Sequence, residues 1–230
     1  MLVSGLQKLT LLDYPGKVAC TVFTGGCNFR CPFCHNSALV LPDRLAHDSS
    51  AEQVLAFLRK RVGVLDGVAV TGGEPLLHPD IADFLKEIKA MGFLVKLDTN
   101  GSFPDRLAAV LEEGLVDYVA MDLKNSPEKY ALTVGLESLE LSPIRRSVKL
   151  LMDSSIPYEF RTTVVDELHK AADFEAMGRW IAGAKAYFLQ PFTDRDSVPF
   201  AGLHAPTREN LEKYASIAKV YVPYTAIRGV

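Results

Sequence analysis

Residues 18–36 read VACTVFTGGCNFRCPFCHN. The first six form an apolar run that ends before a glycine pair, a pattern typical of a buried β-strand. Three of the chain's four cysteines follow directly, at Cys27, Cys31 and Cys34. The stretch therefore predicts a buried strand that leads into a loop rich in thiols.

Five further apolar runs resemble this strand, at residues 68–71, 94–97, 118–121, 158–165 and 187–189. Segments with apolar residues at helical spacing lie between and after them, at residues 51–58, 81–88, 104–113, 143–153, 170–181 and 206–218. Strands that are apolar throughout and alternate with helices are typical of a parallel sheet covered on both faces. Six strand–helix units are too few to close an eight-fold barrel. The sequence therefore predicts an α/β fold, a partial (β/α)6 open barrel, with a final strand at residues 220–222.

The 230 residues carry 25 basic and 28 acidic side chains, a net charge of −3, and 48% of them are hydrophobic. This composition predicts a single domain over residues 1–230, with a barrel core over about 16–190 and a C-terminal helical extension over about 191–230. No basic cluster indicates nucleic-acid binding, residues 1–7 lack a signal-peptide pattern, and no apolar stretch approaches the ~20 residues that cross a bilayer. We therefore expect a cytoplasmic protein with no nucleic-acid or membrane partner.

Glycines and polar residues occur near the carboxyl ends of the predicted strands. In chain order they are Gly72, Gly73 and Glu74, then Asp98, Thr99 and Asn100, then Asp122 and Lys124, then Arg161, and finally Gln190. In parallel α/β folds this edge of the sheet is where ligands bind. These residues and the thiols therefore predict one site at the carboxyl ends of the strands.

Three clustered thiols without a disulfide pattern indicate metal binding or redox chemistry. A structural zinc site is closed by four protein ligands, and no fourth ligand is evident in the sequence. Cys20 falls within the first predicted strand and is expected in the core. His35 directly adjoins Cys34, and adjacent residues rarely reach one tetrahedral ion together. A four-iron cluster held by three cysteines would instead leave one iron open to a ligand.

The C-x-x-x-C-x-x-C pattern, together with CPFCHN, GGEP, DTNG and MDLK in this order, resembles the radical S-adenosylmethionine (SAM) superfamily. Within it the chain is similar to the activating enzymes of glycyl radical enzymes. The segment LTLLDYPGKVACTVFTGGCNFRCPFCHN is especially similar to the activating proteins of anaerobic ribonucleoside-triphosphate reductase. The resemblance runs from Leu9 to Gln190.

This resemblance implies that Cys27, Cys31 and Cys34 are the catalytic cysteines and hold three irons of a [4Fe–4S] cluster. The open iron would bind SAM, and reductive cleavage of SAM would give methionine and a 5′-deoxyadenosyl radical. The radical would then generate a glycyl radical on a partner enzyme. The expected partner is anaerobic (class III) ribonucleoside-triphosphate reductase, with a flavodoxin or ferredoxin as electron donor.

The resemblance also implies SAM contacts. Phe33 and His35 are expected along the adenine. Gly72 and Gly73 would let the backbone approach the methionine end, because neither has a Cβ. Glu74 is expected close to the SAM ammonium.

Further along the chain, the resemblance places Asp98 near the SAM amino group and Lys124 near its carboxylate or ribose. Asn100 is expected either to contact the cofactor or to form an Asx turn, and Arg161 to balance the charge of the acidic rim. A monovalent cation site is expected at Asp98, Thr99 and Asp122, because oxygen ligands suit a hard cation.

Other functions fit part of the pattern. The chain could activate another glycyl radical enzyme of the pyruvate formate-lyase type, or act on a small molecule, as a 7-carboxy-7-deazaguanine synthase does. A non-catalytic metal-binding or electron-transfer protein would give the GGEP and DTNG motifs no purpose. His47, His169 and His204 are interpreted as solvated surface residues.

Overall fold

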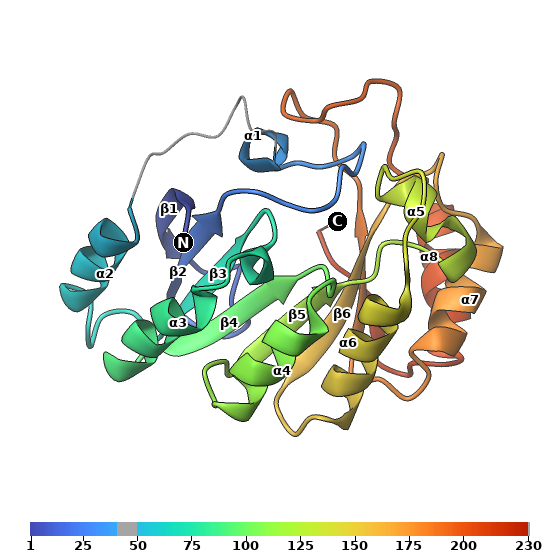
Figure 1. The fold of residues 1–230 in the computed structure, drawn as a ribbon. Coiled ribbons are helices and arrows are strands. Elements are labelled where there is room, and N and C mark those ends of the chain that lie inside the picture. The colour runs from blue at the N-terminus through green and yellow to red at the C-terminus, as the bar shows by residue number, and fades with distance from the viewer. Residues whose placement is uncertain (41–49, 230) are drawn as a thin grey trace. The chain divides into compact units, whose positions relative to one another are not determined.

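The computed structural model describes residues 1–40 and 50–229 (Figure 1). The chain forms two compact units. The first unit comprises Met1–Asn28, Ala38–Ala120 and Ser155–Pro157. The second comprises Phe29–Ser37, Met121–Ser154 and Tyr158–Val230. The chain therefore passes between the units several times, and one of these passages falls within the cysteine loop.

The strands of the first unit are β1 (Val3–Thr10), β2 (Ala19–Thr24), β3 (Gly67–Gly72) and β4 (Leu94–Thr99), hydrogen-bonded in that order. β1 is antiparallel to β2, whereas β2, β3 and β4 are parallel. β5 (Tyr118–Asp122) begins in the first unit and ends in the second. The parallel arrangement brings the carboxyl ends of β2, β3 and β4 to one edge of this unit.

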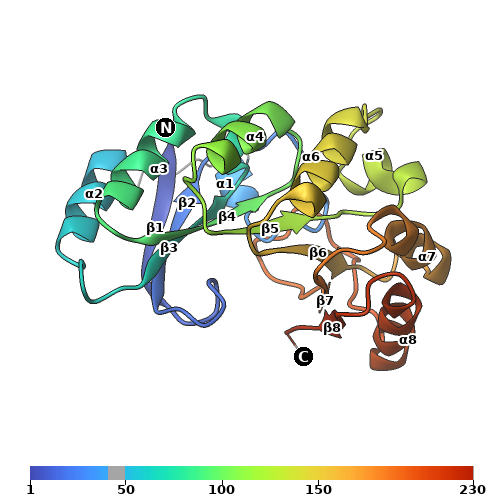
Figure 2. The ribbon, with the colours of Figure 1, turned by 90° about the horizontal axis from the view of Figure 1, so that it is seen from below.

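The helices of the first unit are α2 (Ala51–Arg59), α3 (Ile81–Ala90), α4 (Pro104–Glu112) and the 3₁₀ helix η2 (Pro75–Leu77), with α1 (Ser37–Val40) directly after the cysteine loop. α2 begins at Ser50, whose side chain and that of Gln53 cap each other's backbone N–H groups. Each longer helix buries an apolar stripe, such as Val54 and Leu58 of α2. Figures 1 and 2 show α2, α3 and α4 along one face of the strands.

The second unit contains the parallel strands β6 (Tyr158–Val164), β7 (Tyr187–Pro191) and β8 (Thr225–Ile227). Its helices are η3 (Pro127–Lys129), α5 (Tyr130–Thr133), α6 (Ser142–Asp153), α7 (Ala171–Trp180) and α8 (Arg208–Lys219). α7 and α8 lie side by side (Figure 2), with the rings of Phe174 and Tyr214 stacked 4.5 Å apart. Through α8, the pair contacts the strands β7 and β8.

The predicted parallel α/β organisation is confirmed, because the six predicted strands correspond to β2 through β7. Two strands were not predicted correctly. β1 was missed, and the final strand lies at Thr225–Ile227 rather than at residues 220–222, because the turn that ends α8 occupies those residues. The C-terminal extension therefore contributes a strand as well as a helix.

The prediction that the strands are apolar throughout is wrong for β4 and β6, each of which buries a charged side chain. Lys96 of β4 and Glu159 of β6 are 2% and 0% exposed. Lys96 pairs with Asp98, and Glu159 accepts hydrogen bonds of 2.8 and 3.0 Å from the guanidinium of Arg228. Buried charges of this kind are retained only when they are paired.

The histidine interpretation is also corrected. His169 is fully buried, with Nε2 bonded to the Lys124 carbonyl at 2.9 Å and Nδ1 beside the backbone of Val165. His204 is exposed, as predicted, and pairs with Glu167. His47 lies outside the described residues. None of the described helices has both the length and the apolar character needed to cross a membrane.

Candidate active site

The cysteine loop, residues 25–36, connects β2 to α1. Cys27 belongs to the first unit, and Cys31 and Cys34 belong to the second. Cys27 and Cys34 are half-buried and Cys31 is buried, and all three are thiols rather than disulfides. Cys20 lies within β2 and is fully buried, which confirms that it is a core residue.

The glycine pair after β3 holds the start of the cysteine loop. Gly73 N donates to the Thr24 carbonyl at 2.9 Å, and Glu74 N donates to the Gly26 carbonyl at 2.8 Å. A Cβ on Gly73 would lie 1.9 Å from the Gly26 oxygen, and Gly72 has a φ of +119°. Both positions therefore need glycine to fit the loop backbone, in addition to any approach to SAM.

Glu74 joins the GGEP turn to the DTNG turn. Its carboxylate is fully buried and accepts hydrogen bonds from Leu76 N at 3.0 Å, Thr99 Oγ1 at 2.7 Å and Asn100 N at 2.6 Å. These bonds give Glu74 a positioning role in the first unit. The predicted contact with the SAM ammonium stays a prediction.

Asn100 forms the expected Asx turn, and its contact with the cofactor stays a prediction. Its Oδ1 accepts from Ser102 N at 2.9 Å, which forms the Asx turn. Its Nδ2 donates to Asn28 Oδ1 at 2.9 Å and lies 3.8 Å from Cys27 Sγ. Hydrogen bonds to cluster sulfurs tune reduction potential, so Asn100 is placed to act on the first cysteine.

Lys96 lies near the carboxyl end of β4, beside the predicted site residue Asp98, and was not itself predicted. It lies two positions before Asp98 on β4, so both side chains point to the same face, and its ammonium contacts Asp98 Oδ1. Thr99 is also engaged, because its hydroxyl donates to Glu74 and accepts from Gly101 N at 3.1 Å. A lysine inside an apolar strand was the signal available in the sequence.

In the second unit, Asp122 is held by two cations. Lys124 Nζ donates to its Oδ2 at 2.9 Å, and Arg161 Nε and Nη2 lie 3.1 and 3.0 Å from its Oδ1. Burial disfavours the ionised carboxyl, but the charges of Lys124 and Arg161 outweigh it and lower the pKa of Asp122 to about 2. Burial also opposes the Lys124 ammonium, yet Asp122 and the Cys31 thiol raise the pKa of Lys124.

The backbone around Lys124 is held by residues that were not predicted from the sequence. The Lys124 carbonyl bonds to His169 Nε2, and the next residue, Asn125, donates to Thr133 Oγ1 at 2.8 Å and to the Leu168 carbonyl at 3.1 Å. The peptide before Lys124 is fixed too, since Leu123 N donates to the Arg161 carbonyl at 2.7 Å. The Lys124 side chain therefore emerges from a rigid backbone.

Acid should weaken the ion pairs of Asp122 with Lys124 and Arg161 in a defined pH window. Because the folded pKa of Asp122 lies below the ordinary value of roughly 3.9, its ionisation stabilises the fold above about pH 4 and that contribution is lost as pH falls towards 2. We expect the difference in unfolding free energy between the wild type and Asp122→Asn to be constant above about pH 4 and to shrink below it. Urea denaturation from pH 2 to 7 measures it.

The matched control is Asp153→Asn, which removes an exposed ion pair with Lys149. It should change stability little at any pH in the series. A wild-type minus Asp122→Asn difference that stays constant down to pH 2 would contradict the assigned pairing.

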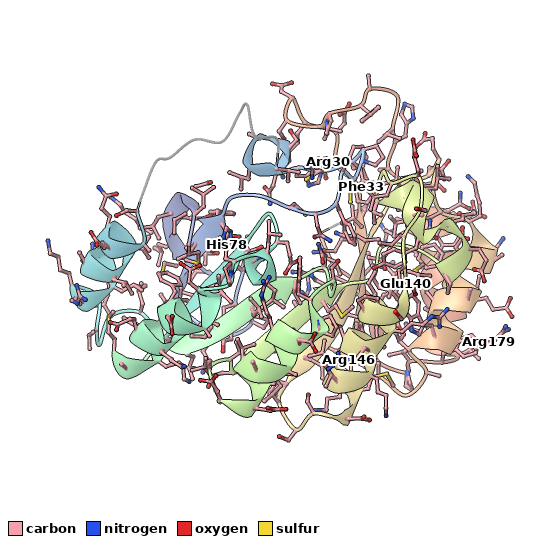
Figure 3. The ribbon with its side chains drawn as sticks, in the orientation of Figure 1. Arg30, Phe33, His78, Glu140, Arg146 and Arg179 are labelled. Carbon is pink, nitrogen blue, oxygen red and sulfur yellow. The ribbon has the colours of Figure 1, made fainter. Side chains whose placement is uncertain are left out.

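The aromatic part of the cysteine loop lies in the second unit. Phe33 is buried, and the His35 ring stacks on Phe192 at 5.6 Å while Nε2 bonds to the Thr193 carbonyl at 2.7 Å. Figure 3 labels Phe33 and Arg30 on this loop. Phe192 and Thr193 directly follow β7 and were not predicted as site residues, although the sequence analysis placed Gln190 of the same strand end at the site.

Comparison with known proteins places the chain in a family. The model of the radical SAM superfamily matches residues 21–178. The chain belongs to the radical SAM superfamily. The family works with a [4Fe–4S] cluster and SAM, so the chain is an enzyme of this cofactor class.

Radical SAM relatives narrow the assignment. A Methanocaldococcus jannaschii protein with the provisional name glycyl-radical enzyme activating enzyme is 30% identical over 239 residues, which covers 100% of this chain and 96% of that protein. The 7-carboxy-7-deazaguanine synthase of Methanopyrus kandleri is 28% identical over 200 residues, covering 78% and 75% of the two chains. The first of these relatives places the chain among the glycyl-radical activating enzymes.

The structure of this chain is also similar to solved structures of radical SAM enzymes. A domain of the pyruvate formate-lyase activating enzyme of Bacteroides vulgatus has a TM-score of 0.59 and 20% identity, and the match covers 71% of this chain and 99% of that domain. The likeness concerns the fold alone. It confirms the predicted fold class, a radical SAM partial barrel.

The donor set fits the cluster that radical SAM enzymes use. Three thiols at Cys27, Cys31 and Cys34 suit iron, and the Asn100 amide contacts one of the sulfurs. Burial raises the pKa of the Cys34 thiol, and the Lys124 charge opposes that rise. Asp122 beside Lys124 acts in the opposite sense, and burial remains the largest influence on the pKa of this thiol.

Proposed function

We propose that this radical SAM protein generates the glycyl radical of an anaerobic (class III) ribonucleoside-triphosphate reductase. The observation that carries the proposal is the match along 96% of a glycyl-radical activating relative. The segment LLDYPGK, which lies between β1 and β2, supports this choice of partner by its resemblance to the reductase activating proteins.

We propose these roles for the site. Cys27, Cys31 and Cys34 hold the [4Fe–4S] cluster, which with bound SAM supplies the 5′-deoxyadenosyl radical. Asn100 donates a hydrogen bond to the Cys27 sulfur and so adjusts the cluster potential. Lys124, held by Asp122 and by its fixed backbone, presents a positive charge for the SAM carboxylate or ribose.

The remaining SAM contacts are proposed from the resemblance. Gly72 and Gly73 accept the methionine end, Glu74 lies close to the ammonium, and Phe33 and His35 contact the adenine. Arg161 contributes through its pairing with Asp122. We further propose that residues 1–230 act as one cytoplasmic radical SAM domain, with a flavodoxin or ferredoxin as electron donor.

The test is radical transfer to a partner. Anaerobically reconstituted protein, SAM and a reductant are mixed with a class III reductase, and the product is read by electron paramagnetic resonance and by chromatography of 5′-deoxyadenosine. We expect a glycine-centred doublet on the reductase and 5′-deoxyadenosine in comparable amount. The control reductase carries alanine at its radical glycine and should give no doublet.

Two outcomes would contradict the choice of partner. A doublet on a pyruvate formate-lyase type enzyme but none on the reductase would move the activity to that partner. SAM cleavage that needs a small molecule and no protein would favour a second candidate, a deazaguanine-forming enzyme. That candidate is supported by the Methanopyrus kandleri relative, which matches 78% of this chain.

A further inference from the structure

The side chains of Asp98, Thr99 and Asp122, which were expected to bind a monovalent cation, already have partners within the chain. In the first unit, the Asp98 carboxylate contacts the ammonium of Lys96, which is 2% exposed. A buried lysine needs a counter-charge, and a carboxylate two residues along the same strand face supplies it. Asp98 therefore already has a cation beside it, and that cation is part of the chain.

Thr99, the second expected ligand, is also engaged within the first unit. Its hydroxyl donates to Glu74 at 2.7 Å and accepts from Gly101 N at 3.1 Å, and the side chain is 3% exposed. A hydroxyl oxygen has two lone pairs, and Gly101 N already uses one of those of Thr99. The Thr99 hydroxyl therefore offers at most one lone pair to a metal ion, while its proton stays with Glu74.

Asp122, the third expected ligand, is paired within the second unit. One oxygen accepts from Lys124 and the other contacts the guanidinium of Arg161, at 2.9 to 3.1 Å. Two cations therefore face this one carboxylate, and a further cation would be repelled by both. Both carboxylates of the expected ligand set are therefore held in ion pairs within the chain.

We propose that Lys96 takes the place of the monovalent metal ion at Asp98, so that this protein binds SAM without a requirement for sodium or potassium. An ammonium is a compact unit charge, so it neutralises Asp98 as an alkali ion would. Because it is covalently attached to β4, its occupancy does not depend on salt composition. The inference rests on the SAM cofactor of the family and not on the proposed reductase partner.

The first test uses the wild-type protein, reconstituted anaerobically. The dissociation constant of SAM is measured from the change in the cluster resonance signal in KCl, NaCl or choline chloride at equal ionic strength. We expect the three values to agree within about twofold, because no metal ion has to bind first. In flow dialysis with radioactive rubidium, the same protein should bind less than one equivalent.

The second test removes the internal cation. Lys96→Met keeps a side chain of similar length but leaves Asp98 without its partner. In choline chloride we expect SAM to bind about tenfold more weakly or worse, with partial recovery in KCl or NH₄Cl, since a small cation can then enter beside Asp98. Lys89→Met is the matched control, because it breaks the Lys89–Asp117 pair of the same unit, and it should leave SAM affinity unchanged.

Either test can overturn the proposal. Wild-type SAM affinity that rises about tenfold or more when potassium replaces choline would show a functional metal site. Stoichiometric rubidium binding to the wild type would do the same. A Lys96→Met variant with wild-type SAM affinity in choline chloride would show that Lys96 supplies nothing the cofactor needs.

Discussion

Replacing Cys31 with alanine should lower 5′-deoxyadenosine formation from SAM by about a thousandfold or more, to background. In the proposed assignment, three thiolates spaced over eight residues hold the cluster, and the loss of one leaves it with too few ligands. The chain has only four cysteines, and the remaining one, Cys20, is fully buried in β2 and cannot replace the lost ligand. Iron and sulfide content, with chromatography of the SAM products, measures the effect.

Cys20→Ala is the matched control. It removes a thiol of the same chain from a site with 0% exposure, and should keep the iron content and SAM cleavage of the wild type while costing roughly 1–2 kcal/mol of stability. The ligand assignment fails if Cys31→Ala retains a full cluster and cleaves SAM. It also fails if Cys20→Ala loses iron while remaining folded.

Glu74→Ala should lower the free energy of unfolding by about 3–4 kcal/mol, a large effect for one residue. The fully buried carboxylate accepts from Leu76 N, Thr99 Oγ1 and Asn100 N. Without it these donors lose their acceptor inside the first unit. Urea denaturation of the cluster-free protein measures the change without any contribution from iron.

Two further variants test the mechanism of this loss. Glu74→Gln keeps the oxygen that serves Leu76 and Thr99 but replaces the one that serves Asn100, so we expect an intermediate loss of about 1–2 kcal/mol. Glu113→Ala removes an exposed acid paired with Lys86 and should cost less than about 0.5 kcal/mol. Equal stabilities for Glu74→Ala and Glu113→Ala would show that Glu74 does not join the two turns.

The strands that alternate with helices were predictable because burial on both faces requires continuous apolar runs. β2 through β7 follow that rule closely enough to be found. β1 does not, because Val3–Thr10 has an exposed stretch at residues 7–9 and a glycine at its centre. Its strand form depends on antiparallel pairing with β2, a long-range contact that local pattern does not reveal.

The loop of three cysteines after β2 was predictable from the sequence, whereas the contacts that support it were not. Lys96 and His169 are buried polar residues: Lys96 pairs with Asp98 on the same strand, and His169 bonds to the distant Lys124 carbonyl. Sequence position alone assigns such side chains to the surface, because an unpaired charge is rarely buried. Gly73 was predicted to let the backbone approach SAM because it has no Cβ. The structure adds a second reason, since a Cβ at this position would lie only 1.9 Å from the oxygen of Gly26.

The burial of Cys20 also gives the chain a built-in reporter of unfolding. Alkylating reagents react with thiolates, and burial raises the pKa of Cys20 to about 12, so its thiol is both shielded and protonated at neutral pH. Labelling of the folded chain should therefore spare Cys20. The fourth label is added when β2 opens, which separates loss of the cluster from loss of the fold in a single mass spectrum.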